Sequence, residues 1–320
     1  MLTILATLLP IFALIFLGLA MDRARFISPA MGLCLNQFVY WVGFPALLFN
    51  QMTEIRPEQI SWGILAGLGL SAVLSWMMTM FAVRKKRGEE RAEHTMFSLL
   101  ATFPNFAYMG LSIIALLRPG NAQALVVASL SSIIYIALML FADAKLEMEQ
   151  HKGRHWSKSL PLVGLSLLKN PMFTGTVLGA IIGLGGITLP RPGKVFFTML
   201  GNTAAPCALI SMGMLLGNQL SALKDLSRQW LKSQALLHGI KLILVPAVAF
   251  LCLLAFGVRG ISLGVGTIIA ATPIGVAAYV ISEKYGLLPQ ESSLGIVLNT
   301  ALSIITLPLT ILLMEYLGYL

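Results

Sequence analysis

The sequence predicts an all-α integral membrane protein with ten transmembrane helices. Only 11% of its 320 residues are charged and 57% are hydrophobic, whereas a soluble domain carries about 25% charged residues. The mean hydropathy is +0.85, and apolar runs of about 20 residues, long enough to cross a bilayer as a helix, recur along the chain. The predicted membrane helices are 2–21, 31–52, 60–83, 94–117, 121–144, 170–189, 195–217, 231–256, 261–282 and 291–317.

Charge and cysteine content narrow the class of protein further. The chain has a net charge of +9. In a membrane protein such an excess of basic residues is typical of the cytoplasmic loops and does not indicate binding to nucleic acid. Cys34, Cys207 and Cys252 lie in apolar runs without paired spacing, so neither a disulfide nor a metal site is expected. The first run, 2–21, has no basic residue before it and no cleavage site after it, and we expect it to be a retained membrane helix.

Basic residues predict the orientation, because cytoplasmic loops are enriched in lysine and arginine. The loops after the odd-numbered runs carry most of the 22 basic residues. These are Arg23, Arg25, Arg84, Lys85, Lys86, Arg87, Arg91, Lys145, Lys152, Arg154, Lys158, Lys169, Lys224, Arg228, Lys232 and Lys284. The sequence therefore predicts that these loops are cytoplasmic and that both termini face the opposite side.

Two prolines stand in the middle of apolar runs, Pro104 in ATFPNFAYMG and Pro273 in AATPIGVAAY. Proline lacks an N–H and its ring clashes with the preceding turn, so a helix through it kinks or breaks. In lipid, the backbone groups freed by a break need partners from protein or water. We expect the fourth and ninth helices to be broken at these prolines and to meet.

A second pair of prolines, Pro45 and Pro206, lies in the second and seventh runs at nearly the same spacing. The two halves of the chain thus carry matching features, and halves of five helices each must have opposite orientations. This is the inverted-repeat plan of secondary transporters, in which broken helices occupy corresponding positions. Residues 1–144 are predicted to form the first repeat, 145–169 a cytoplasmic linker and 170–320 the second repeat.

Motifs along nearly the whole chain resemble those of the auxin efflux carrier (PIN-like) family, in particular its bacterial malonate and malate carriers. They are LNQFVYWVGFPALLF, TFPNFAYMG, LLKNP, IKLILVPAV with GVRG, and TPIGVAAYVISEKYGLLPQ with TLPLTILL. The resemblance implies a fold like that of sodium/proton antiporters and bile-acid symporters, with the two broken helices crossing at mid-membrane. It also implies a scaffold of helices 1, 2, 6 and 7, a homodimer through helices 2 and 7, and a transport domain of helices 3–5 and 8–10 that moves as an elevator.

The predicted crossing is a candidate site for an organic anion. A half-helix that starts after each proline presents unpaired N–H groups and about half a positive charge, which attract a carboxylate. The resemblance places Asn105 at the substrate-binding Asn of the family and Ser131 where plant members have Gln. The candidate substrate-binding residues are Thr102, Pro104, Asn105, Ser131, Ser132, Thr272, Pro273, Ile274 and Gly275.

Lys241 is the one basic residue deep within an apolar run, and His238 lies three residues before it. An ionisable group at this depth is usually functional, so Lys241 is a candidate for supporting substrate binding or switching. The alternative is that its stem extends to the interface and leaves the charge in water. His238 is either a structural residue or the carrier of a coupling proton.

The sequence as a whole predicts a secondary transporter in the inner membrane of a bacterium, with malonate or a related dicarboxylate as its substrate. We expect anion transport either to be coupled to protons or to proceed without a coupling ion. The alternatives are an efflux carrier for an aromatic or hydroxy monocarboxylate, a cation/proton exchanger of similar fold, which would need a carboxylate near the crossing, and a sensor that binds without turnover. The chain has no His-Glu-x-x-His and no phosphate-binding glycine loop, so neither an enzyme nor a cofactor is expected.

Overall fold

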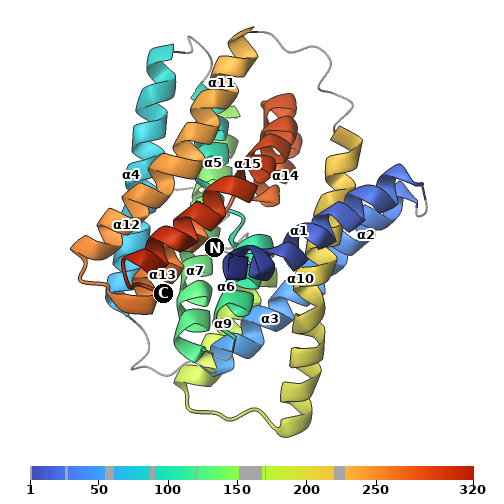
Figure 1. Cartoon of the computed structure of the whole chain (residues 1–320), viewed down its shortest axis with the longest axis vertical. Helices are drawn as coiled ribbons and strands as arrows, with labels where there is room; N and C mark the ends of the chain where they lie inside the picture. The colour runs from blue at the N-terminus through green and yellow to red at the C-terminus, as the bar shows by residue number, and fades with distance from the viewer. Residues whose placement is uncertain are drawn as a thin grey trace.

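The computed structural model describes residues 2–25, 28–54, 61–86, 91–119, 121–150, 168–169, 171–219 and 228–320. This part of the chain is helical, and its one β-type pairing is a single bridge between Pro104 and Ile274. The all-helical prediction is therefore confirmed for the described residues (Figure 1). Among them, five helical stretches are long and apolar enough to cross a membrane: Ala30–Thr53, Trp62–Arg84, Gln123–Glu149, Trp230–Ala255 and Pro289–Tyr316.

The helices follow the apolar runs of the sequence. The first half contains α1 (Leu2–Arg23), α2 (Pro29–Phe38), the π-helical turn η1 (Val39–Gly43), α3 (Phe44–Thr53), α4 (Trp62–Lys86), α5 (Arg91–Thr102), the π-helical turn η3 (Phe106–Gly110), α6 (Leu111–Leu117) and α7 (Ala122–Gln150). The second half contains α9 (Pro171–Leu184), α10 (Arg191–Gln219), α11 (Arg228–Gly239), the π-helical turn η5 (Ile240–Leu244), α12 (Val245–Ala255), α13 (Gly260–Ala271), α14 (Val276–Tyr285) and α15 (Pro289–Tyr316).

The structure treats the prolines in three different ways. Pro206 and Pro308 lie inside continuous helices. Pro45 and Pro246 each follow a π-helical turn, η1 or η5, and stand in the first turn of the next α-helix, where the missing N–H is tolerated. Among the described prolines that fall within the predicted membrane helices, only Pro104 and Pro273 stand where a helix stops, between α5 and η3 and between α13 and α14.

Helix α7 is longer than the sequence predicts. It continues to Gln150, so residues 145–150 of the expected linker are helical, while 151–167 and 170 lie outside the described residues. Lys145 forms an ion pair with Glu149 one turn away, and such i,i+4 pairs extend a helix into water. The apolar run alone marked only the hydrophobic part of this helix.

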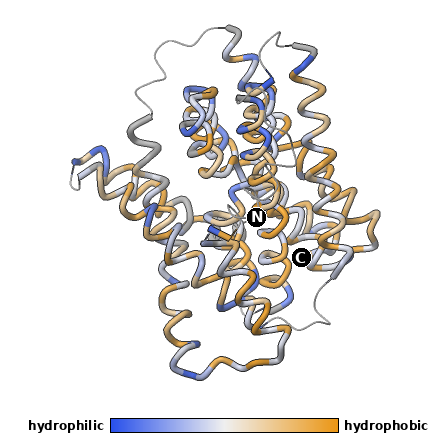
Figure 2. The backbone as a smooth tube through the Cα atoms, turned by 180° about the vertical axis from the view of Figure 1, so that it is seen from behind, coloured by the Kyte–Doolittle hydropathy of each residue, from blue (hydrophilic) through white to orange (hydrophobic). Residues whose placement is uncertain are grey.

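The helices pack in two groups; in Figure 1, α2 and α10 of one group lie on the right and α4, α11 and α12 of the other lie on the left. One group contains α1, α2, α3, α9 and α10, and its main contacts are α1 with α10 and α3 with α9. The other is built from α4, α5, α7 and α11–α15, with α12 packed on α4 and α13. Hydrophobic residues run along the lengths of the helices (Figure 2), and large ones such as Trp62 and Phe81 are exposed, which suits contact with lipid.

Candidate functional site: a crossing of two broken helices beside a cavity

The two breaks cross and hydrogen-bond to each other as a short antiparallel pair. The backbone N–H of Asn105 donates to Pro273 O at 2.7 Å, and that of Gly275 donates to Phe103 O at 3.0 Å. Pro104 and Ile274 lie opposite each other in this pair. Backbone groups freed by one break are therefore satisfied by the other, which a buried break requires.

Gly275 makes the close approach of the two breaks possible. A Cβ atom at this position would lie 2.6 Å from the Phe103 ring and 2.8 Å from Pro104 O. No side chain fits at that distance, so glycine is required here.

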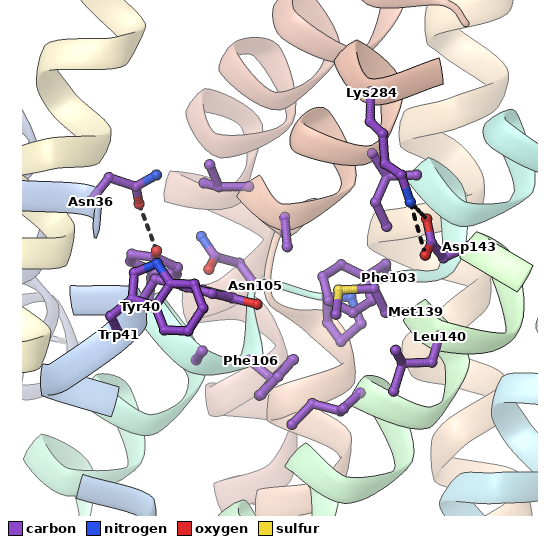
Figure 3. Close-up of a pocket in the computed structure, with 18 of the residues that line it drawn as sticks. Asn36, Tyr40, Trp41, Phe103, Asn105, Phe106, Met139, Leu140, Asp143 and Lys284 are labelled. Carbon is purple, nitrogen blue, oxygen red and sulfur yellow. Dashed lines mark hydrogen bonds and ion pairs between the residues drawn. The ribbon is translucent and has the colours of Figure 1, made fainter. Parts of the chain in front are cut away.

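A cavity of about 550 Å³ lies against the crossing. Its wall is mainly apolar and rich in aromatic rings, and Figure 3 shows Tyr40, Trp41, Phe103 and Phe106 around Asn105. The lining residues come from α2 (Leu33, Asn36, Gln37), η1 (Tyr40, Trp41), the first break with η3 (Phe103, Pro104, Asn105, Phe106, Ala107, Tyr108), α7 (Ile136, Met139, Leu140, Asp143), Lys169, and the second break with α14 (Gly275, Val276, Ala277, Ile281, Lys284).

Both half-helices that follow the breaks begin at this cavity. In η3 the first hydrogen bonds within the helix are donated by Met109 and Gly110 to Asn105 O, so the N–H groups of the three residues before them precede the ladder. Those residues, 106–108, all line the cavity, and η3 has no side-chain cap within the described chain. Val276 and Ala277 hold the same position at the start of α14. Two positive helix ends thus face one space.

Three of the residues predicted from the sequence line the cavity: Pro104, Asn105 and Gly275. Pro273 and Ile274 belong to the crossing but do not line the cavity. Asn105 is buried, with 1% of its surface exposed. Its φ of −78° and ψ of 54° are outside the helical region, as expected for the residue that precedes a new helix.

The four predicted hydroxyl residues lie outside the cavity lining. Ser131 Oγ donates to Val127 O at 2.7 Å and Ser132 Oγ to Ser129 O at 2.6 Å. Thr102 and Thr272 likewise donate to carbonyls of their own helices, Ser98 O at 2.6 Å and Ile269 O at 2.7 Å. Serine and threonine hydroxyls often bond to the preceding turn in this way, and here the bonds supply the hydroxyls with acceptors away from the cavity.

Lys241 is completely buried, and its Nζ donates to Ala270 O at 2.7 Å. The alternative that its charge extends to the membrane interface is therefore wrong. Ala270 lies in the last turn of α13, where the carbonyl groups have no partners in the helix and carry partial negative charge. The lysine thus supports the helix end that leads into the second break.

His238, a candidate from the sequence, is joined to the same break through Asn299, which the sequence analysis did not single out. Asn299 of α15 accepts the Ile274 N–H at its Oδ1 (3.0 Å), and its Nδ2 lies 2.8 Å from Nδ1 of His238 on α11. Asn299 is fully buried. The available signal was an asparagine in the middle of an apolar run, since polar residues in membrane helices are usually functional.

Two further contacts at the cavity were also missed. The Tyr108 hydroxyl donates to Asn36 Oδ1 at 2.7 Å and so joins η3 to α2. At the solvent-exposed edge of the cavity, Lys284 of α14 forms an ion pair with Asp143 of α7 at 2.8 Å. The carboxylate that lines the cavity is thus held at its edge by a lysine, away from the crossing.

Two broken helices that cross beside a cavity, in an all-helical and strongly apolar chain, define a membrane transporter. The chain belongs to the family described as membrane transport protein, whose model matches residues 3–311. It is therefore an integral membrane transport protein and not an enzyme, and its resemblance to the auxin efflux carriers is confirmed.

Three relatives illustrate the family. A "Putative malonate transporter" of Rhizobium meliloti is 29% identical over 309 residues, which cover 93% of this chain and 92% of that protein. The "Uncharacterized transporter YfdV" of Escherichia coli is 22% identical, with 95% of each chain covered. The "Auxin efflux carrier component 2" of Oryza sativa is 26% identical over 166 residues, 50% of this chain and 25% of that protein.

Proposed function

We propose that this protein is a secondary transporter that binds a small organic anion where the two broken helices cross. The observation that carries the proposal is that η3 and α14 both begin at one cavity, at Phe106 and Val276. Each helix start contributes about half a positive charge and N–H donors. Together they attract a carboxylate without a fixed basic residue, as half-helices do in other transporters.

Helix packing supports ten membrane passes in two inverted repeats, 1–144 and 170–320, with 145–169 between them. In such a plan α1 corresponds to α9, and the α2–α3 pass corresponds to α10. The two pairs that pack most closely, α1 with α10 and α9 with α3, are then equivalent. Both are closed by glycines against backbone: Gly18 and Gly213 in the first pair, Gly175 and Gly179 in the second.

The two packing groups support an elevator mechanism. The scaffold consists of α1–α3, α9 and α10 and carries the dimer contact through α2–α3 and α10; the remaining helices form the transport domain. The cavity lies between α2 of the scaffold and the crossing. The bond from Tyr108 to Asn36 joins the two bodies and must break when one slides past the other.

The edge of the cavity supports a cytoplasmic opening. Lys169 and Lys284 lie at this edge, in loops predicted to be cytoplasmic from their basic residues. In this orientation both termini face the periplasm of a bacterial inner membrane, and the positive edge draws anions toward the cavity.

Malonate or a related dicarboxylate is the first substrate proposed, because a relative of 29% identity carries a malonate transporter name. The aromatic wall formed by Tyr40, Trp41 and Phe103 favours a second candidate, a monocarboxylate with an apolar body. The cation/proton exchanger has less support, because Asp143 is paired with Lys284 at the edge of the cavity.

Uptake into proteoliposomes tests the function directly. Labelled malonate and labelled phenylacetate should be compared, and one of them should accumulate inside vesicles that contain the protein. Asn105→Ala should lower uptake about 10- to 100-fold, because a hydrogen bond to a charged group contributes about 1.5–3 kcal/mol.

Ser131→Ala is the matched control, since the Ser131 hydroxyl bonds to its own helix and does not line the cavity. Its uptake should equal that of the wild type. Equal uptake by Asn105→Ala would place the site elsewhere. Binding of an organic acid without any flux would identify a sensor and reject the transporter.

A further inference from the structure

A relay from the partly buried His238 to two buried residues contacts the crossing without lining the cavity. It runs from His238 on α11 through Asn299 on α15 to the backbone N–H of Ile274. None of these three residues lines the cavity. The relay therefore meets the second break away from the proposed anion site, although Ile274 is next to Gly275, which does line the cavity.

The two hydrogen bonds fix the protonation state of the relay. A side-chain amide has one accepting end and one donating end. Because Asn299 Oδ1 accepts from Ile274 N–H, its Nδ2 must donate to His238 Nδ1. His238 Nδ1 is then an acceptor without a proton, and the neutral ring carries its hydrogen on Nε2.

We infer that His238 is the proton-binding group of this transporter and that Asn299 couples its protonation to anion binding at the crossing. The inference rests on the proposed function. A proton on Nδ1 turns this atom into a donor, and it then needs Asn299 Oδ1 as its acceptor. The amide must turn over to supply it, which ends the bond to Ile274 N–H and so changes the backbone of the second break next to Gly275, which lines the cavity.

Lys241 adds to this coupling when it carries its charge. Lys241 follows His238 by three residues, about one helical turn, and is completely buried. A second positive charge near a buried ammonium is unfavourable unless an anion is close by. An anion at the crossing supplies that negative charge, so proton and anion should bind together and move together.

Other ionisable residues lie on the elements that pack against α11, namely α5, η5 and α15. Apart from Lys241 in η5, they are Arg91, Glu93 and His94 in α5, and Glu291 and Glu315 in α15; α11 itself also carries Arg228 and Lys232. Except for Glu315 near the end of α15, these residues lie in the first two turns of their helices. His238 is in the last turn of α11, where Lys241 is the nearest of them in sequence.

The tautomer of His238 can be tested without any substrate. The chain has four histidines, so ¹⁵N-histidine spectra are simple, and the signal lost in His238→Asn identifies this ring. At neutral pH we expect the hydrogen on Nε2, and Asn299→Leu should change the Nδ1 shift by removing its donor. A hydrogen on Nδ1 in the wild type would overturn the relay.

Proton uptake on anion binding tests the coupling. Calorimetry with malonate and with phenylacetate, in buffers of different ionisation enthalpy, counts the protons taken up. The wild type should bind at most about one proton with each anion. Its affinity for the anion should then rise by at most about tenfold for each unit by which the pH falls. His238→Asn keeps an amide oxygen near the position of Nδ1 but cannot bind the proton, so uptake and pH dependence should disappear.

His94→Gln is the matched control, because His94 is a buried histidine on another helix, α5. It should keep the proton uptake of the wild type. Anion binding without proton uptake in the wild type would overturn the coupling and leave the proposed function standing, as would uptake that persists in His238→Asn. Failure of both acids to bind or to be transported would contradict the proposed function itself.

Discussion

The two breaks of the crossing share one backbone arrangement but differ in their surroundings. At the first break, Asn105 and the three residues after it line the cavity, and no side chain caps η3 within the described chain. At the second break, two side chains from other helices support the backbone: Lys241 at Ala270 O and Asn299 at Ile274 N–H. The first break is open toward the cavity, and the second is held from behind.

This difference indicates that the two breaks have different roles in binding the substrate. The residue after the proline is Asn105 in the first break and Ile274 in the second. An amide on the cavity side can bind a carboxylate directly, whereas an apolar side chain leaves only backbone for that purpose. Ionisable residues are expensive in a membrane interior, and here they gather at the break that does not offer a polar side chain to the cavity.

The largest effect is expected where the breaks meet, at Gly275. Gly275→Ala brings a methyl group against the Phe103 ring and Pro104 O, and overpacking of this kind costs about 1–3 kcal/mol or more. Because the clash involves backbone of the other break, the crossing must open, and the cost should lie at the upper end of this range, about 3 kcal/mol or more. We expect transport to fall at least about 100-fold, measured as uptake by protein that still elutes as a folded species.

Gly110→Ala is the matched control for Gly275→Ala. A Cβ at Gly110 would meet its nearest neighbour, Ile269 Cγ1, at 3.6 Å, an ordinary contact, and alanine favours a helix by about 1 kcal/mol over glycine. Uptake close to that of the wild type is expected. If both variants transport equally well, close contact between the breaks is not needed for transport.

The next largest effect is expected at the support of the second break, Lys241. Lys241→Met keeps the length of the side chain but removes the charge that reaches Ala270 O. Loss of a charged hydrogen bond costs about 1.5–3 kcal/mol, so uptake should fall about 10- to 100-fold. Lys232→Met is the control, because Lys232 is exposed on α11. An equal loss of uptake in both variants would mean that uptake depends on the overall charge of the protein and not on the bond from Lys241 to Ala270 O.

The order of helices was predictable because apolar length and proline chemistry act locally. The same local rules did not separate Pro104 and Pro273 from Pro206 and Pro308, which lie inside continuous helices. A helix stops at a proline only where other backbone can satisfy the freed groups. That backbone comes from the other repeat, and the sequence alone does not show how it is placed.

The candidate site was predictable only in part, for the same reason. Asn105 and Gly275 follow from the break itself, since one begins a helix at the cavity and the other allows close approach. Asn299 and Asn36 act through contacts with residues 25 and 72 positions away. Ser131 was expected at the site, yet its hydroxyl bonds to the preceding turn of its own helix. The residue type alone does not predict which acceptor a serine hydroxyl will use.

The smallest effect is expected at the bond that joins the open break to α2. Tyr108→Phe removes the hydroxyl that donates to Asn36 Oδ1, which should cost about 0.5–1.5 kcal/mol and shift the balance away from the conformation with this cavity by about 2- to 13-fold. A cysteine introduced at Met139, which lines the cavity, should be labelled more slowly by that factor in a background free of the native cysteines. Tyr40→Phe alters another tyrosine of the same wall and should leave the labelling rate unchanged. If Tyr108→Phe is labelled as fast as the protein with Tyr108, the Tyr108–Asn36 bond does not hold the two helix groups together. The first break would then differ from the second only in the groups that it presents to the substrate.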